Sequence, residues 1–438
     1  MSFFYNPKLK LYIPENRLSH HIQNVGAPGT RKSSLIRGFV RQAKQRGWPC
    51  VFTDLKGEYF DEFYEEGDYL IDFMDERCPR WMIGYEALDE PSGMTLGEGA
   101  FPDEAHRAFF FQDHSRAILG YLEGVHHFST SELSRILINE DLLDRMLRGT
   151  EHAGTIKKNS PEQRNGILGT LNHLGRPMRW MPDEQGRREF CVREWAAMGP
   201  ERTGSIFLRS TPLTFPGLRP MQSLILDLAL LGAMTYPGPC LFVLDEIGEF
   251  QRSPQLRRAM AMMRSSGSVI ILGYQGFTQL EKVYGSEDAE TIMTSAYTNI
   301  VMATSGKRSA EFSSALLGLP SEIKRGRPST SRRLFDTPLS ERVSMIQENT
   351  MVPAVTPGQI QCLEDGRGFM AQRGVIVPIN VDYNPPIVNN VQLIERYIPE
   401  STDIESEPQE LRAMPKPVVE KPHKSKYTRS HEQAEICN

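Results

Sequence analysis

Short apolar runs alternate with segments of helical period over most of the chain. The run at residues 241–244 is continuous and contains the β-branched Val243, which is typical of a buried strand in a parallel sheet. After it, Leu256 and Met260 recur at helical spacing before the next apolar run. This alternation predicts an α/β fold with a doubly wound, mainly parallel sheet of at least five core strands. The expected strands are residues 8–14, 21–25, 49–53, 69–73, 205–208, 241–244, 268–273, 299–303 and 375–381. The first is expected to be a short edge strand, and the last is expected at an edge because it contains Pro378.

The pattern changes between residues 103 and 200, where apolar positions follow helical spacing and no strand pattern is found. Helices are expected over residues 104–124 and 131–147, and a third begins at the capping box S-P-E-Q of residues 160–163. We therefore predict an all-α domain at residues 103–200, inserted into a discontinuous α/β domain of residues 1–102 and 201–399. Residues 400–438 are rich in Glu, Pro, Lys and Ser, which predicts a disordered tail.

Two carboxylates, Asp245 and Glu246, follow directly after the apolar run 241–244. Open α/β sheets bind ligands at the carboxyl ends of their strands, where Asp245 would hold a hydrated Mg²⁺ and Glu246 would orient an attacking water. Gln275 follows the strand predicted at 268–273, so its amide would lie beside this pair and sense a phosphate or a water. The alternative is an ordinary acid pair at a strand end and a polar loop residue.

A glycine-rich turn lies between the predicted strand 21–25 and a helical pattern that begins near residue 35. In such a turn, backbone N–H groups and the helix N-terminus cradle phosphates. Lys32 would contact the β- and γ-phosphates, and the hydroxyl of Ser33 would hold Mg²⁺. The predicted nucleotide-binding residues are Gly26, Ala27, Pro28, Gly29, Thr30, Arg31, Lys32, Ser33 and Ser34.

Arg31 stands where the phosphate-loop pattern G-x-x-x-x-G-K-[ST] has its second glycine. Three readings stay open: its side chain points outward, it adds a phosphate contact, or it impairs hydrolysis. Asp54, Lys56 and Glu58 follow the strand predicted at 49–53 and could approach the same site. They are equally compatible with an ordinary turn.

The whole-chain properties limit the remaining function classes. The 438 residues are 39% hydrophobic, enough for a sizeable core, and the net charge of −5 argues against a protein that coats nucleic acid. The start has no signal-peptide pattern and no apolar run reaches membrane-spanning length, so a cytoplasmic location is expected. A basic segment containing Lys324, Arg325 and Arg327 is predicted to be a loop that either enters a DNA minor groove or is simply solvated.

The order of these motifs resembles a known family. A phosphate loop, D-L-K-G-E, an all-α insertion, L-D-E, a trailing arginine and G-Y-Q occur in the order found in conjugative coupling proteins of type IV secretion, the TraD/TrwB/TraG type. The resemblance covers roughly residues 10–390. It implies a RecA-like P-loop NTPase core with an inserted all-α domain, in a ring ATPase that is typically a homo-hexamer.

The resemblance also implies roles for individual residues. Lys32 and Ser33 match the Walker A pair, Asp245 and Glu246 match the Walker B pair, and Gln275 matches the sensor glutamine. Arg264 matches an arginine finger that reaches into the neighbouring subunit's site. The implied cofactors are ATP and Mg²⁺. The implied partners are single- or double-stranded DNA, a relaxase or relaxosome, and secretion-channel proteins.

Two features depart from the family's pattern: Arg31, and the lack of the usual membrane anchor before the phosphate loop. The leading hypothesis is an ATP-dependent translocase that delivers single-stranded DNA with its relaxase to a secretion channel, acting in the cytoplasm or peripherally at the inner membrane through partners. The first alternative is a non-hydrolysing, nucleotide-gated module that recruits DNA or protein. The second is a soluble ring translocase outside secretion.

Overall fold

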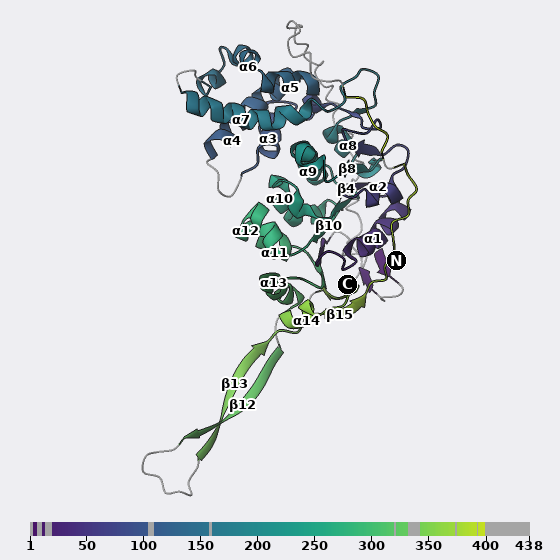
Figure 1. Ribbon diagram of the computed structural model, residues 1–438, viewed down its shortest axis with the longest axis vertical. Helices are drawn as coiled ribbons and strands as arrows, with labels where there is room; N and C mark the ends of the chain where they lie inside the picture. The colour runs from purple at the N-terminus through teal and green to yellow at the C-terminus, as the bar shows by residue number, and fades with distance from the viewer. Residues whose placement is uncertain are drawn as a thin grey trace, which may run out of the picture.

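A nine-stranded sheet forms the centre of the computed structural model (Figure 1), in the order β15-β14-β11-β3-β10-β9-β4-β8-β5. The structure describes residues 3–6, 11–13, 20–103, 109–156, 160–318, 321–331, 342–372, 375–391 and 393–398. The parallel strands are β3 (Ile22–Val25), β4 (Cys50–Asp54), β5 (Tyr69–Ile71), β8 (Ile206–Arg209), β9 (Leu241–Leu244), β10 (Val269–Tyr274) and β11 (Thr298–Met302). The antiparallel strands β14 (Arg367–Gln372) and β15 (Val375–Asn380) complete one edge. The mainly parallel sheet and the edge position of the last strand are therefore confirmed.

Helices cover both faces of this sheet (Figure 1). One face carries α1 (Lys32–Gln45) and α2 (Glu58–Phe63). The other carries α9 (Phe215–Thr235), α10 (Pro254–Met262), α11 (Phe277–Tyr284), α12 (Ser286–Thr294) and α13 (Lys307–Leu317), with α14 (Pro357–Gln361) packed against α13. Successive strand residues point to opposite faces, so Val51 and Phe242 join one buried cluster while Phe52 and Val243 join the other. This two-sided burial explains the continuous apolar runs in the sequence.

The helical region at one end of the sheet contains α3 (Glu90–Ala100), α4 (Phe109–Tyr121), α5 (Thr130–Ile138), α6 (Glu140–Leu147) and α7 (Pro161–Met178). Helices α3 and α4 cross closely, because a Cβ atom on Gly93 would lie 2.3 Å from the carbonyl oxygen of Gly120. We therefore propose that the helical domain includes α3 and begins before residue 103. The capping hydrogen bond predicted at Ser160 is not formed, although Pro161 does occupy the first turn of α7.

One short strand, β7 (Glu189–Phe190), occurs in the region where the sequence predicted helices alone. β6 (Arg80–Trp81) pairs in parallel with β7, and α8 (Val192–Ala197) follows. A two-residue pairing is too short to leave a periodic signal in the sequence, which explains why β7 was not predicted. The edge strand predicted at residues 8–14 corresponds to β2 (Leu11–Ile13), but its place in the main sheet was wrong, because β2 pairs with β1 (Phe3–Asn6) in a separate two-stranded sheet.

The basic segment is a strand, so its prediction as a loop was wrong. β12 (Ser321–Ser331) contains Lys324, Arg325 and Arg327 and pairs antiparallel with β13 (Arg342–Val352). This ribbon projects away from the sheet (Figure 1). The prediction rested on the Arg, Gly and Pro content of one segment, whereas a ribbon forms by backbone pairing with a second segment, here residues 342–352.

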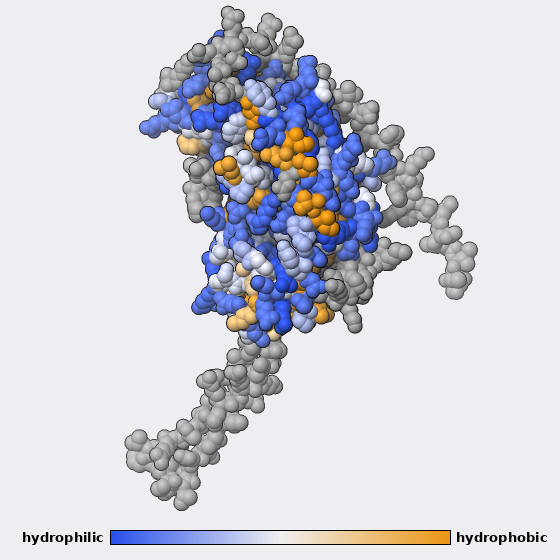
Figure 2. Space-filling view, turned by 45° about the vertical axis from the view of Figure 1, so that its right-hand side comes forward, coloured by the Kyte–Doolittle hydropathy of each residue, from blue (hydrophilic) through white to orange (hydrophobic). Residues whose placement is uncertain are grey.

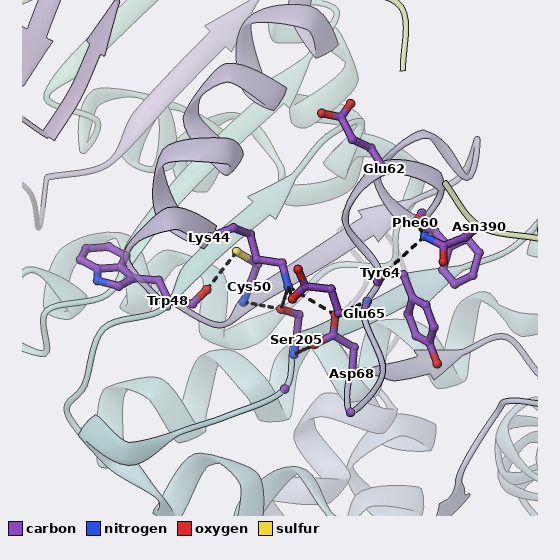
Figure 3. Close-up of polar contacts among 12 residues, drawn as sticks. Lys44, Trp48, Cys50, Phe60, Glu62, Tyr64, Glu65, Asp68, Ser205 and Asn390 are labelled. Carbon is purple, nitrogen blue, oxygen red and sulfur yellow. Dashed lines mark hydrogen bonds and ion pairs between the residues drawn. The ribbon is translucent and has the colours of Figure 1, made fainter. Parts of the chain in front are cut away.

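A polar network joins the amino ends of several strands (Figure 3). The Ser205 hydroxyl, just before β8, accepts a hydrogen bond from the backbone N–H of Cys50 at 3.2 Å, and the Ser205 N–H donates to Asp68 at 2.6 Å. Lys44, in the last turn of α1, lies 3.1 Å from Glu65 and 3.4 Å from Asp68. The network fixes the far end of α1 to the sheet, so the first turn of α1 has a defined position at the opposite edge.

After β15 the chain crosses the α1 and α2 face, and we call residues 381–391 and 393–398 the C-terminal strap. The carbonyl of Asn384 accepts a hydrogen bond from Arg37 of α1, and the Asn390 side chain donates to backbone carbonyls at the end of α2 (Figure 3). Arg396 donates to the carbonyl of Trp180 beyond α7. Apolar patches interrupt the polar surface on the face shown in Figure 2. Large side chains of the strap are exposed at Tyr383, Ile387, Val388, Val391 and Tyr397.

Asp227 of the buried helix α9 provides a stability prediction. Its carboxylate accepts hydrogen bonds from the Ser253 hydroxyl and, at 3.0 Å, from the Gln255 N–H at the start of α10. Burial raises the pKa of Asp227 from 3.8 to about 6, although these two hydrogen bonds oppose the shift. Because the folded state holds this proton more tightly than the unfolded state, stability is lost as pH rises from about 4 to 6.

Asp227→Asn keeps an acceptor oxygen and removes the titration. We expect the free energy of unfolding of the variant, relative to wild type, to rise by roughly 1–3 kcal/mol between about pH 4 and pH 7. Urea unfolding of both proteins across this range measures the difference. A difference that does not change with pH would contradict the assignment.

Candidate nucleotide-binding site

Four neighbouring strands end together at one edge of the sheet. The phosphate loop follows β3, and Gln275 follows the neighbouring strand β10. The pair Asp245-Glu246 follows β9, and the turn with Lys56 follows β4. The strands pair in parallel register, with Leu272 opposite both Gln23 and Leu244. The sheet order therefore places segments more than 200 residues apart in sequence beside one another.

The phosphate loop is anchored to its neighbours through its backbone. The N–H of Gly26 donates to the carbonyl of Tyr274 at 3.2 Å, and the N–H of Ala27 donates to that of Ala303 at 2.7 Å. Lys32 begins α1 and donates from Nζ to the carbonyls of Gly26 at 2.6 Å and Ala27 at 3.1 Å. Burial lowers the pKa of Lys32, and the nearby charges of Asp245 and Glu246 oppose this shift. A buried ammonium above a glycine-rich helix start favours an anionic ligand.

Arg31 points out of the loop. Its backbone adopts the left-handed conformation (φ 70°, ψ 24°), and its Nη1 donates to the carbonyl of Val381 at 2.9 Å, where the C-terminal strap begins. Of the three readings of this residue, the structure supports the outward one. Arginine here bears a conformational cost of about 1–2 kcal/mol that glycine would avoid, and its hydrogen bond to the strap offsets part of that cost.

This orientation makes Arg31→Gly a mild change. We expect nucleotide affinity to stay within about threefold of wild type, because relief of backbone strain and loss of one hydrogen bond nearly cancel. Equilibrium binding of a fluorescent nucleotide measures it. Arg31→Ala is the matched control, since it loses the hydrogen bond but keeps the strain. A loss of affinity above about tenfold in both variants would show that the side chain contacts the phosphates.

Asp245, the predicted magnesium ligand, is held by two hydroxyl groups. Its Oδ2 accepts hydrogen bonds from the Ser33 hydroxyl and the Tyr59 hydroxyl, each at 2.9 Å. Its Oδ1 is buried and has no hydrogen-bond partner among the residues that the structure describes. A Cβ atom on Gly273 would lie 2.3 Å from this Oδ1, so glycine is required beside it. A free carboxylate oxygen beside a serine hydroxyl is a hard oxygen donor set, which fits Mg²⁺.

Glu246 differs from Asp245 in its backbone conformation and in the residue with which its carboxylate pairs. It adopts the left-handed conformation (φ 55°, ψ 39°), and its Oε1 lies 2.9 Å from the Nζ of Lys56. Gln275 is partly buried next to β9, and its backbone N–H donates to Gln279 at 3.1 Å. The loop, the acidic pair and Gln275 are thus brought to one edge, as predicted from the order of the strands.

Arg264 is not part of this group within one chain. It lies in the 3₁₀ turn Met263–Ser265, next to Ser266, whose carbonyl accepts the N–H of Gly238 just before β9. This is the amino edge of the sheet, opposite Lys32 and Asp245. Arg264 is exposed and has no ion-pair partner in the described part of the chain.

Two of the charged residues of the D-L-K-G-E turn make contacts outside the predicted site, and the third contacts a predicted site residue. Asp54 is buried and accepts the N–H of Phe60 at 2.7 Å, and burial raises its pKa to about 7. Glu58 pairs with Arg37 at 2.7 Å. Lys56 alone of the three pairs with a predicted site residue. Tyr59, whose hydroxyl donates to Asp245, was not predicted as a site residue. In the sequence, an aromatic residue in the first turn of a helix cannot be distinguished from one that packs in the core.

Comparison with known proteins identifies the family. A model of the type IV secretion-system coupling protein DNA-binding domain matches residues 9–381. The chain belongs to this coupling-protein family. A coupling-protein relative, "Coupling protein TraD" of Escherichia coli (strain K12), is 23% identical over 354 residues, which are 78% of this chain and 49% of TraD. The chain thus spans about half the length of that curated relative.

Solved structures share the coupling-protein fold. Unbound TrwBdeltaN70, a bacterial conjugative coupling protein, superimposes with a TM-score of 0.76 at 21% identity, covering 89% of this chain and 90% of that chain. TrwB in complex with ADP and Mg²⁺ gives 0.75 at 20% identity, covering 88% and 90%. The RecA-like α/β fold predicted from the sequence is confirmed. No helix within the described ranges has the length and apolar character needed to cross a bilayer.

Proposed function

We propose that this chain binds ATP with Mg²⁺ and hydrolyses it to move DNA, as the coupling ATPase of a conjugative type IV secretion system. The observation that carries the proposal is the Oδ1 of Asp245, which has no hydrogen-bond partner in the described part of the chain and lies beside Ser33 at the same edge as Lys32 and Glu246. The solved complex of TrwB, a protein of the same fold, with ADP and Mg²⁺ supports it.

Each residue has a separate task in this proposal. The loop of residues 26–34 binds the phosphates, Lys32 neutralises them, and Ser33 and Asp245 hold Mg²⁺. When bound, Mg²⁺ neutralises charge on the phosphate oxygens. Tyr59 orients Asp245 through its hydroxyl. Glu246 accepts the proton of the attacking water, and Gln275 helps to position that water.

A larger cleft supports a polymeric ligand outside the nucleotide site. It has a volume of about 1100 Å³ and lies between α4 and α7 on one side and α11 and the 3₁₀ turn Ile247–Glu249 on the other. Gln279 donates to Glu249 at 3.1 Å across its floor, and also accepts the backbone N–H of Gln275. A DNA strand there would contact the two short elements that directly follow Glu246 and Gln275. The basic cleft residues are His173, Arg219, Arg252 and Lys282.

Several further parts of the proposal follow from the family. The working form is a homo-hexameric ring in which Arg264 completes the neighbouring site. Its partners are DNA, a relaxase and the secretion-channel proteins, at the cytoplasmic side of the inner membrane. Lys324, Arg325 and Arg327 on the β12–β13 ribbon are proposed DNA contacts. ATP hydrolysis measured with and without single-stranded DNA tests the proposal.

The non-hydrolysing alternative loses its main support. It rested on Arg31, whose side chain is directed to the carbonyl of Val381. A loop released from hydrolysis also has no need for Glu246, Gln275 and Arg264 together. We therefore retain the hydrolytic proposal.

A further inference from the structure

Lys56 occupies a position that the proposed nucleotide mechanism leaves without a task. It lies in the turn between β4 and α2, and its Nζ is 2.9 Å from Oε1 of Glu246. The Lys56 side chain is 58% exposed and that of Glu246 is 23% exposed. A lysine with this exposure has a flexible stem and can change partners at little cost.

The surroundings of Lys56 include the predicted metal ligands. One small cavity is lined by Lys56, Glu246, Asp245, Ser33 and Tyr59. In the sheet order β3-β10-β9-β4, the strand that ends at Asp245 lies between the strand before the phosphate loop and the strand before Lys56. Lys32 and Lys56 therefore lie at the same edge of the sheet, on either side of the buried carboxylate Asp245.

The backbone of Glu246 limits where its carboxylate can go. Glu246 is in the left-handed conformation, and its carbonyl accepts the N–H of Glu249 at 2.9 Å, which begins the next 3₁₀ turn. Non-glycine residues held in this region are commonly found at functional sites. With the backbone in this conformation, one oxygen of the carboxylate is directed to Lys56 in the turn between β4 and α2.

We propose that Lys56 is a sensor of the terminal phosphate, whose ammonium exchanges between Glu246 and the γ-phosphate of a bound nucleoside triphosphate. This role rests on the proposed nucleotide site. A γ-phosphate carries more charge than a single carboxylate and so competes for the ammonium. Its arrival releases Glu246 to orient water, whereas a diphosphate leaves the Lys56–Glu246 pair in place.

A purely structural ion pair would behave differently. A pair as exposed as this one contributes little to stability. Its removal would also alter the binding of diphosphate and triphosphate equally, because neither ligand would compete for it. The difference in affinity between the two nucleotides therefore separates the roles.

The test is the affinity of the purified full chain for Mg-ADP and for a non-hydrolysable Mg-ATP analogue, by isothermal titration calorimetry. Lys56→Met is expected to weaken analogue binding about tenfold and ADP binding less than about twofold. Lys56→Arg, which keeps the charge, is expected to restore most of the loss. Lys307→Met is the control, because Lys307 is 89% exposed on α13 and pairs with Glu311 one turn away.

Glu246→Gln supplies the second arm. Removal of this carboxylate frees Lys56, so analogue affinity is expected to rise about threefold or more, and the gain is expected to vanish in the double variant with Lys56→Met. Equal weakening of ADP and analogue by Lys56→Met, or a gain that persists in the double variant, would overturn the sensor role alone. Failure of wild type to bind either nucleotide would overturn both the site and the sensor.

Discussion

Glu246→Gln is expected to reduce ATP turnover by about 100- to 10,000-fold without weakening nucleotide binding. Glu246 lies at the carboxyl end of β9, next to the magnesium-ligand candidate Asp245. An amide has nearly the same shape as a carboxylate but cannot accept the proton of an attacking water. The phosphate loop and Ser33 are untouched, so the ground-state complex is retained. Steady-state phosphate release and nucleotide titration on the same preparation separate the two effects.

The control for this variant is Glu194→Gln on α8, where the side chain is 59% exposed and pairs with Arg193. Its turnover is expected to match wild type. The role of Glu246 would be refuted by a glutamine variant that hydrolyses ATP within about tenfold of wild type. Lys32→Ala is expected to differ from Glu246→Gln, because it should lower the affinity for nucleotide.

Arg264→Ala is expected to reduce DNA-stimulated turnover by about 1,000-fold while nucleotide affinity is unchanged. The reason is the position of Arg264 at the amino edge of the sheet, exposed and opposite its own phosphate loop. An arginine in this position can contact a nucleotide only in a neighbouring copy of the chain. Phosphate release measured at saturating single-stranded DNA detects the loss.

Mixing two inactive variants tests the shared site more strictly. In a ring containing both Arg264→Ala and Glu246→Gln subunits, some interfaces combine an intact Arg264 with an intact Glu246. Activity should therefore reappear on mixing. Arg257→Ala is the matched control, because Arg257 is on α10, 54% exposed, and pairs with Asp288 at 3.4 Å. A mixture as inactive as its components would argue against a finger from the neighbouring subunit.

The sequence was sufficient to predict the elements whose physical requirements are local. The strand at 241–244 is apolar because both of its faces are buried. The acidic pair after it indicates that ligands bind at this edge of the sheet. The phosphate loop needs small residues before Lys32 and a helix after it, so its motif is compact. Parallel strands then place both motifs at one edge, which is why most of the candidate site could be predicted.

The features that were missed depend on contacts between distant segments. The direction of Arg31 depends on the carbonyl of Val381, 350 residues later, and the role of Tyr59 depends on Asp245. The β12–β13 ribbon depends on pairing between two segments, one of which has no strong strand signal. None of these requirements leaves a periodic pattern within one segment.

The most direct test of the account is phosphate release from ATP by the wild-type chain, with and without single-stranded DNA, over a wide range of protein concentrations. We predict that specific activity rises when DNA is added and rises steeply with protein concentration, because each site needs Arg264 from a second subunit. Glu246→Gln measured in parallel should be at least about 100-fold less active than wild type under all of these conditions. Bound ATP without phosphate release at any protein concentration or DNA length would contradict the account.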